Sequence, residues 1–138
     1  MPGWRQSKRD SHGALSAAFA AFGHTLAMVE AAKEALTSAV PGRRGPGVAL
    51  AEAVGGFEQD LRRAAEQMPS WRVPEVEAAW SACASAVQES LRRSEVFRLE
   101  ASPDGYEHLY LALGELMDPL GVFQDAVGRF QTLGLRPR

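Results

Sequence analysis

One apolar stripe over residues 106–130 constrains this chain more than any other feature. Its apolar residues alternate in steps of three and four, which is the a/d seam of a heptad and predicts a long helix packed along other helices. The stripe consists of Tyr106, Leu109, Leu113, Leu116, Leu120, Phe123, Val127 and Phe130.

Three further segments have the same period. We predict helices over residues 11–39, over 48–67 and from Pro74 to about Glu100, and the fourth helix ends near Thr132. Proline and glycine break the chain between them, and each link holds only about five to seven residues. Because short links make neighbouring helices antiparallel, the predicted fold is all-α, an antiparallel up-down-up-down four-helix bundle. The seam of the first helix contains Leu15, Phe19, Phe22, Leu26, Val29, Lys33, Leu36 and Val40. That of the second contains Leu50, Val54, Phe57, Leu61, Ala64 and Met68. That of the third contains Val76, Trp80, either Cys83 or Ala84, Val87 and Leu91, and reaches Phe97.

The length of 138 residues suits one domain with its own hydrophobic core. We expect a flexible N-terminal tail over residues 1–10, a single bundle domain over 11–132 and a short C-terminal tail over 133–138.

Composition narrows the class of protein. Hydrophobic residues make up 46% of the chain, which argues against disorder, and the net charge of −2 argues against nucleic-acid binding. Arginine pairs alternate with acids such as Glu58, a pattern typical of solvated helix faces. The single cysteine, Cys83, forms no disulfide framework and suits a reducing compartment.

The N-terminal segment imitates a signal peptide, because Arg5, Lys8 and Arg9 precede an apolar run. The seam of the first helix, however, continues through any plausible cleavage point. No uninterrupted apolar run reaches the ~18 residues of a membrane span. We therefore expect a cytoplasmic protein without a membrane segment.

Catalytic and metal-binding patterns are missing from the sequence. A di-iron bundle needs Glu-x-x-His pairs, and the chain has none; no two of its three histidines have the spacing of metal ligands. One cysteine cannot build a Cys/His zinc site, and Cys83 lies on an apolar stripe. No nucleophile elbow, phosphate loop or dinucleotide fingerprint occurs, and the glycine-rich turn 42–47 lacks the Gly-Lys-Ser/Thr signature. We expect no catalytic residue, metal or cofactor.

Pro119 interrupts the fourth predicted helix and frees the carbonyl of Glu115 from its hydrogen bond within the helix. Either the helix kinks near Pro119, or Asp118 caps a new helix that begins there. The seam keeps its phase from Leu116 to Leu120, which favours the kink.

Glycine recurs every seven residues along one flank of the fourth helix. Each glycine weakens a helix by about 1 kcal/mol relative to alanine, which a close approach of another helix backbone would offset. That helix is either the alanine-rich first helix or one from a partner protein; compositional drift is the third explanation. The candidate partner face consists of Tyr110, Gly114, Met117, Gly121, Gln124 and Gly128.

Lys33 occupies a seam position where an apolar residue is expected, and the third helix turns polar at Ser90 and Ser94. Lys33 either extends to the surface and pairs with a neighbouring glutamate, or lines a polar pocket. The candidate pocket consists of Lys33, Ser90, Ser94 and Tyr110.

These patterns favour a small helical-bundle protein that acts through protein–protein contacts, as an adaptor, an assembly subunit or a regulator. Its partner is another protein or a second copy of the chain. The alternative function is a small-molecule-binding bundle that uses the candidate pocket, and an enzyme is the least favoured class.

Overall fold

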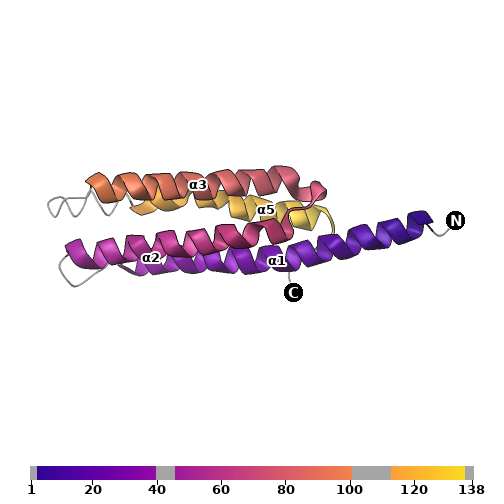
Figure 1. The fold of residues 1–138 in the computed structure, drawn as a ribbon, viewed down its shortest axis with the longest axis horizontal. Helices are drawn as coiled ribbons and strands as arrows, with labels where there is room; N and C mark the ends of the chain where they lie inside the picture. Colours follow the sequence, from indigo (N-terminus) through magenta and orange to yellow (C-terminus); the bar gives the residue numbers. More distant parts are fainter. Residues whose placement is uncertain (1–2, 40–45, 101–112, 136–138) are drawn as a thin grey trace.

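The computed structural model describes residues 3–39, 46–100 and 113–135. Within these ranges every regular element is a helix and no strand occurs. Helices α1 (Gly3–Ala39), α2 (Pro46–Gln67) and α3 (Glu77–Glu100) are continuous, and a fourth helical segment over 113–132 is interrupted once. The predicted all-α class with four helices is therefore confirmed. α1 lies alongside α2, and α3 lies alongside the end of the fourth segment, α5 (Figure 1).

Helix α1 begins at Gly3, whereas the sequence predicts a flexible tail over residues 1–10. No proline follows Gly3 in that stretch, and lengthening an existing helix carries no new nucleation cost. The first turns of α1 project beyond the other helices (Figure 1). The stretch Gly13–Thr37 is long and apolar enough, by length and composition alone, to cross a membrane, a property that core helices and signal sequences share.

Two short 3-10 helices, Met68–Trp71 and Pro74–Val76, connect α2 to α3. Each has proline at its start, where the missing amide hydrogen has no helical partner to lose. Trp71 is fully buried, and the indole Nε1 of Trp80 donates a hydrogen bond of 2.8 Å to the carbonyl of Met68. This connection is therefore part of the core.

The core contains apolar residues from every predicted seam. An aromatic cluster closes one end of it, where the ring of Phe22 lies 4.8 Å from that of Trp71 and 5.0 Å from that of Phe130. Burying each of these side chains contributes about 1.5–3 kcal/mol. The fully or nearly fully buried seam residues include Leu15, Phe22, Val29, Leu36, Val54, Phe57, Leu61, Ala64, Met68, Val76, Cys83, Val87, Leu113, Leu116, Leu120, Phe123 and Phe130.

The fourth segment changes its geometry at the proline. Residues 113–117 are α-helical, Asp118–Gly121 form a 3-10 turn, and α5 covers Val122–Thr132. The N-cap of α5 is Gly121, and no side chain caps either the turn or α5. Asp118 therefore does not cap a new helix.

Gly134 ends α5 in the left-handed region, with φ of 90°. Its amide donates to the carbonyl of Gln131 at 2.9 Å, and the amide of Leu135 donates to that of Phe130 at 3.0 Å. This is the Schellman arrangement, which glycine adopts without a Cβ penalty.

Candidate functional site

The glycine flank of the fourth segment lies away from the rest of the chain. Gly121 and Gly128 are exposed and Gly114 is half-buried. A Cβ atom built on any of the three would meet no atom of the described residues within 4 Å. The described part of the chain thus provides no close helix backbone, such as that of α1, against this flank. Tyr110 lies outside the described residues.

Two other members of the candidate partner face border α1. The hydroxyl of Thr37 lies 3.7 Å from the sulfur of Met117, and the amide Nε2 of Gln124 lies 3.4 Å from the Oε1 of Glu30. The face therefore has one edge along α1, while the glycines lie further towards solvent.

The carbonyl of Glu115, which Pro119 frees, has a partner within the chain. The Nη1 of Arg93, on α3, donates a hydrogen bond to it at 2.7 Å. The Nε of Arg93 also bonds the carboxylate of Glu89 at 3.2 Å. Arg93 thus connects α3 to the interruption in the fourth segment, and the carbonyl is not left for a ligand.

Two members of the candidate pocket are buried in the core together with an acid. Ser90 and Ser94 are inaccessible to solvent, and the hydroxyl of Ser94 donates to Glu58 Oε1 at 2.7 Å. Glu58 is only 3% exposed, although the sequence places it on a solvated face. The hydroxyl oxygen of Ser90 is buried without a hydrogen-bond partner among the described residues. The interior between α2 and α3 is therefore polar at this level.

Sequence reasoning missed Glu58, although a signal for its burial exists. Glu58 directly follows Phe57 and precedes Leu61 by three positions, so it lies beside the α2 seam. The pattern alone does not decide whether such a border residue faces a neighbour or solvent.

The observed contact of Lys33 is with an acid of its own helix and not with Ser90 or Ser94. Its Nζ pairs with Glu30 Oε1 at 3.5 Å, one helical turn away, and its side chain is 28% exposed. This pairing is one of the two alternatives that the sequence leaves open. The structure therefore groups Ser90, Ser94 and Glu58, and places the Lys33 ammonium group at the surface of α1.

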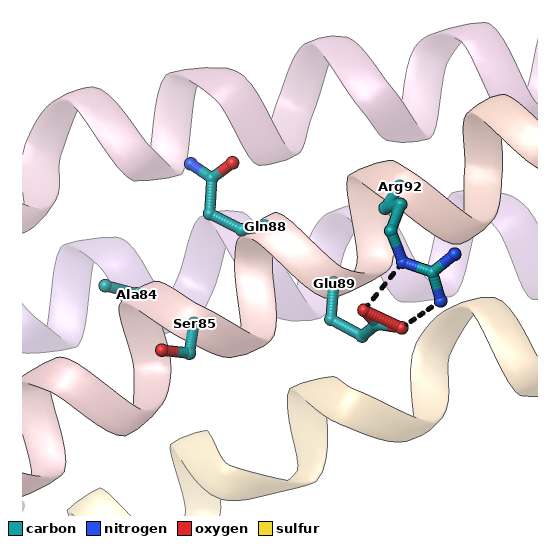
Figure 2. A pocket seen from close by; sticks show the side chains of 5 residues that line it. All are labelled: Ala84, Ser85, Gln88, Glu89 and Arg92. Carbon is teal, nitrogen blue, oxygen red and sulfur yellow. Dashed lines mark hydrogen bonds and ion pairs between the residues drawn. The ribbon is translucent and has the colours of Figure 1, made fainter.

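Two shallow grooves lie on the outer side of α3. One, of about 580 Å³, is lined by Ala84, Ser85, Gln88, Glu89 and Arg92, and Figure 2 shows Glu89 and Arg92 turned towards each other. The other, of about 560 Å³, lies over α2 and α3 and is lined by Arg62, Ala65, Glu66, Gln88, Leu91, Arg92 and Glu95. Hydrogen bonds from Arg92 and Arg93 lower the pKa of Glu89 to about 2. The carboxylate is thus engaged by guanidinium groups and is a poor proton acceptor.

The thiol of Cys83 is also unsuited to chemistry. Burial, and secondarily the negative charge of Asp125, raise its pKa to about 12. The sulfur lies 3.9 Å from the carbonyl oxygen of Val122, within the core. In addition, the described residues contain no group of three or more His, Cys, Asp or Glu that could hold a metal ion.

Comparison with known proteins identifies no relative. No family model matches the chain, no curated protein matches it, and no solved structure matches it.

Proposed function

We propose that this chain is a helical-bundle protein that acts through protein–protein contacts, as an adaptor, an assembly subunit or a regulator, inside the reducing cytoplasm. We place its contact face on the outer flank of the fourth segment, at Gly114, Met117, Gly121, Gln124 and Gly128; the sequence period adds Tyr110 to the same face. One observation supports this choice above others: three glycines spaced by seven residues lie in open space.

Two glycines of this flank lower the stability of the isolated chain. Gly114 and Gly128, which lie within helical turns, together weaken the helix by about 2 kcal/mol relative to alanine. Gly121 is the N-cap of α5, a position where glycine is preferred over alanine. No atom of the described residues packs within 4 Å of the Cβ positions of these glycines, so close packing inside the described chain does not offset that loss. The backbone of a partner helix lying along the flank would offset it, because glycine permits close approach.

The chemistry of the flank suits a contact of this kind. Its described members carry no formal charge, and the cores of protein interfaces are depleted of charged residues. Met117 is half-buried, and its flexible side chain can adapt to a partner surface.

The direction in which the flank faces depends on the order of the helices and on the bend of the fourth helix. We propose both features along with the contact face. The helices run up-down-up-down, each antiparallel to the next, and the fourth helix kinks near Pro119. The proline supports a kink at this position because proline is a recognised cause of helix bending, and the 3-10 turn Asp118–Gly121 agrees with it because such turns within a helix often mark a hinge. Gly121, the last residue of the turn, lies in the middle of the flank.

The test is capture of partners from an extract of the native organism, with the full chain as bait and quantitative mass spectrometry as readout. We expect a protein that binds the wild type to be lost when Gly121 and Gly128 are both replaced by arginine. Gly55→Arg on α2 is the matched control, since this glycine also has open space around it. Equal capture by the wild type and the flank variant would refute the contact face.

A second candidate function is supported by the polar interior. A buried hydroxyl at Ser90 without a partner, beside the Ser94–Glu58 hydrogen bond, is the kind of group that a small polar ligand satisfies. The binding site is then the polar interior around Ser90, Ser94 and Glu58. Lys33, which the sequence also assigns to this pocket, pairs with Glu30 instead, and Tyr110 lies outside the described residues.

A thermal-shift screen of small polar compounds tests this alternative. A hit should raise the melting temperature of the wild type and lose its effect in Ser90→Ala. Ser81→Ala, an exposed serine on the same helix, is the control. A hit that acts equally on both variants would exclude binding at Ser90.

A further inference from the structure

One end of the interior is held together by aromatic rings. At this end, which we call the aromatic end, the rings of Phe22, Trp71 and Phe130 lie 4.8–6.2 Å apart. They come from α1, from the connection between α2 and α3, and from α5. Arg129 of α5 also donates hydrogen bonds of 3.0 and 3.1 Å to the carbonyl of Glu75 in that connection. Large apolar contacts and paired polar groups therefore make the aromatic end resistant to local opening.

The interface between α2 and α3 is polar at a second level. It contains Glu58, Ser90 and Ser94, all buried, which we call the polar layer. The hydroxyl of Ser94 donates to Glu58 Oε1 at 2.7 Å, whereas the hydroxyl of Ser90 has no hydrogen-bond partner among the described residues. A buried polar group without a partner has lost its bonds to water and gained none in return. This layer therefore favours contact with water more than packed apolar side chains would.

The polar layer lies far from the aromatic end and beside a surface groove. Trp80 of α3 packs at the aromatic end and bonds the carbonyl of Met68, and the Glu58–Ser94 bond lies ten residues before Met68 and fourteen after Trp80. At 1.5 Å per residue, the layer is about 15 Å further along α2 and about 21 Å further along α3. Arg62, which lines the groove of about 560 Å³ over the two helices, lies 3.4 Å from Glu58 Oε2. Water in that groove thus lies one side chain away from the polar layer.

We propose that the bundle opens locally and reversibly at the polar layer. α3 moves away from α2 at this level, water enters from the groove, and the aromatic end stays packed as the fixed end of the movement. Opening hydrates the hydroxyl of Ser90 and the carboxylate of Glu58, which offsets part of the loss from exposing the apolar residues beside them. A molecule that binds only the open form would increase its population. The polar layer is thus a device that makes the interior of the bundle accessible.

This inference rests on neither of the proposed functions, because it concerns the free chain without a partner or a ligand. Partner capture by the glycine flank and thermal shifts by small compounds can both fail while the opening persists. The experiments below use the purified full chain alone, so their failure leaves the two proposed functions as they stand.

Native-state hydrogen exchange, followed by NMR at low urea concentrations, tests the opening. We expect the backbone amide of Ser90 to exchange about tenfold or more faster than that of Cys83, seven residues earlier on α3. Exchange at Ser90 should depend little on urea, because a local opening exposes little surface, whereas exchange at Cys83 should follow global unfolding. Equal exchange rates with the same dependence on urea would overturn the proposal.

An apolar variant of the layer tests the cause of the opening. Ser90→Ala and Ser94→Ala combined with Glu58→Met remove the polar groups and keep a long side chain at position 58. Exchange at position 90 should then slow to the rate at Cys83. Ser85→Ala, at an exposed serine of the same helix, controls for the helix propensity of alanine and should change neither rate. If position 90 still exchanges fast in the apolar variant, the motion is fraying of α3 and the role of the polar layer is wrong.

Thiol labelling gives a second measurement that does not require the apolar variant to fold. Ser90→Cys in a Cys83→Ala background is compared with the wild type, whose only thiol is Cys83. Both positions are fully buried on the same helix, so burial in the closed form does not distinguish them. We expect the thiol at position 90 to react about tenfold or more faster. Equal rates, both as slow as global unfolding measured in urea, would contradict the local opening.

Discussion

The hydrogen bond between Arg93 and the carbonyl of Glu115 leads to a quantitative prediction. Pro119 has no amide hydrogen, so the Glu115 carbonyl lacks its usual donor in the helix. The Nη1 of Arg93 replaces that donor at 2.7 Å. Replacing Arg93 by methionine keeps an apolar stem and removes the guanidinium group, so the variant isolates the contribution of the polar head.

The expected loss follows from the geometry. A hydrogen bond from a charged donor contributes about 1.5–3 kcal/mol when it is shielded from water. The Arg93 side chain is 37% exposed, so solvent screening reduces this to about 1–1.5 kcal/mol. For a chain of this length, such a loss lowers the melting temperature by about 3–7 °C.

A double-mutant cycle separates this bond from the other contact of Arg93. Pro119→Ala supplies a backbone amide that can bond the Glu115 carbonyl. Arg93→Met in that background should therefore cost only about 0.5 kcal/mol, a coupling of about 1 kcal/mol. The loss of the Glu89 contact occurs in both backgrounds and cancels. Urea unfolding followed by circular dichroism measures all four proteins.

Equal losses in the two backgrounds would refute the reasoning. In that case the stabilisation by Arg93 would arise from Glu89 or from packing of its stem. Glu89→Gln provides the independent measure of the first of these contributions.

Three further predictions concern glycines, the thiol and one carboxylate. Gly128→Ala should stabilise the isolated chain by up to about 1 kcal/mol. Gly134→Ala should instead destabilise it by about 1 kcal/mol, because the φ of 90° at this residue disfavours a Cβ. Thermal melts check this pair, since the two variants should shift the melting temperature in opposite directions. Cys83 should react with a thiol reagent only as fast as the chain opens, since burial raises its pKa to about 12, and rapid labelling of the native protein would contradict its burial. The folded pKa of Glu89 lies below its ordinary value of 4.5, at about 2, so ionised Glu89 stabilises the fold above pH 4.5 and this contribution is lost as the pH falls towards 2. Urea unfolding should thus show Glu89→Gln to be less stable than the wild type at pH 7 and equal to it near pH 2.

The helices and their inward faces could be predicted because both depend on local patterns. The apolar period identifies the residues that become buried, such as Phe22 and Phe123, without reference to any partner helix. Pro74 and Gly134 likewise mark a start and an end through their own backbone chemistry.

The candidate site was only partly accessible from the sequence. The freed carbonyl of Glu115 was predictable, because it follows from proline chemistry alone, but its partner Arg93 lies 22 positions away on another helix. The open space around Gly121 is equally non-local, since it depends on where α1 passes.

The sequence by itself therefore determined an all-α chain, the number of its helices and the side of each that faces the core, because helical periodicity is a property of neighbouring residues. The tertiary structure decided whether the residues at the borders of those seams are buried or exposed. Glu58 became buried against Ser94, whereas Lys33 turned to Glu30 at the surface. The physical reason is that a border residue is covered or exposed according to the rotation and spacing of two helices, which only their joint packing sets.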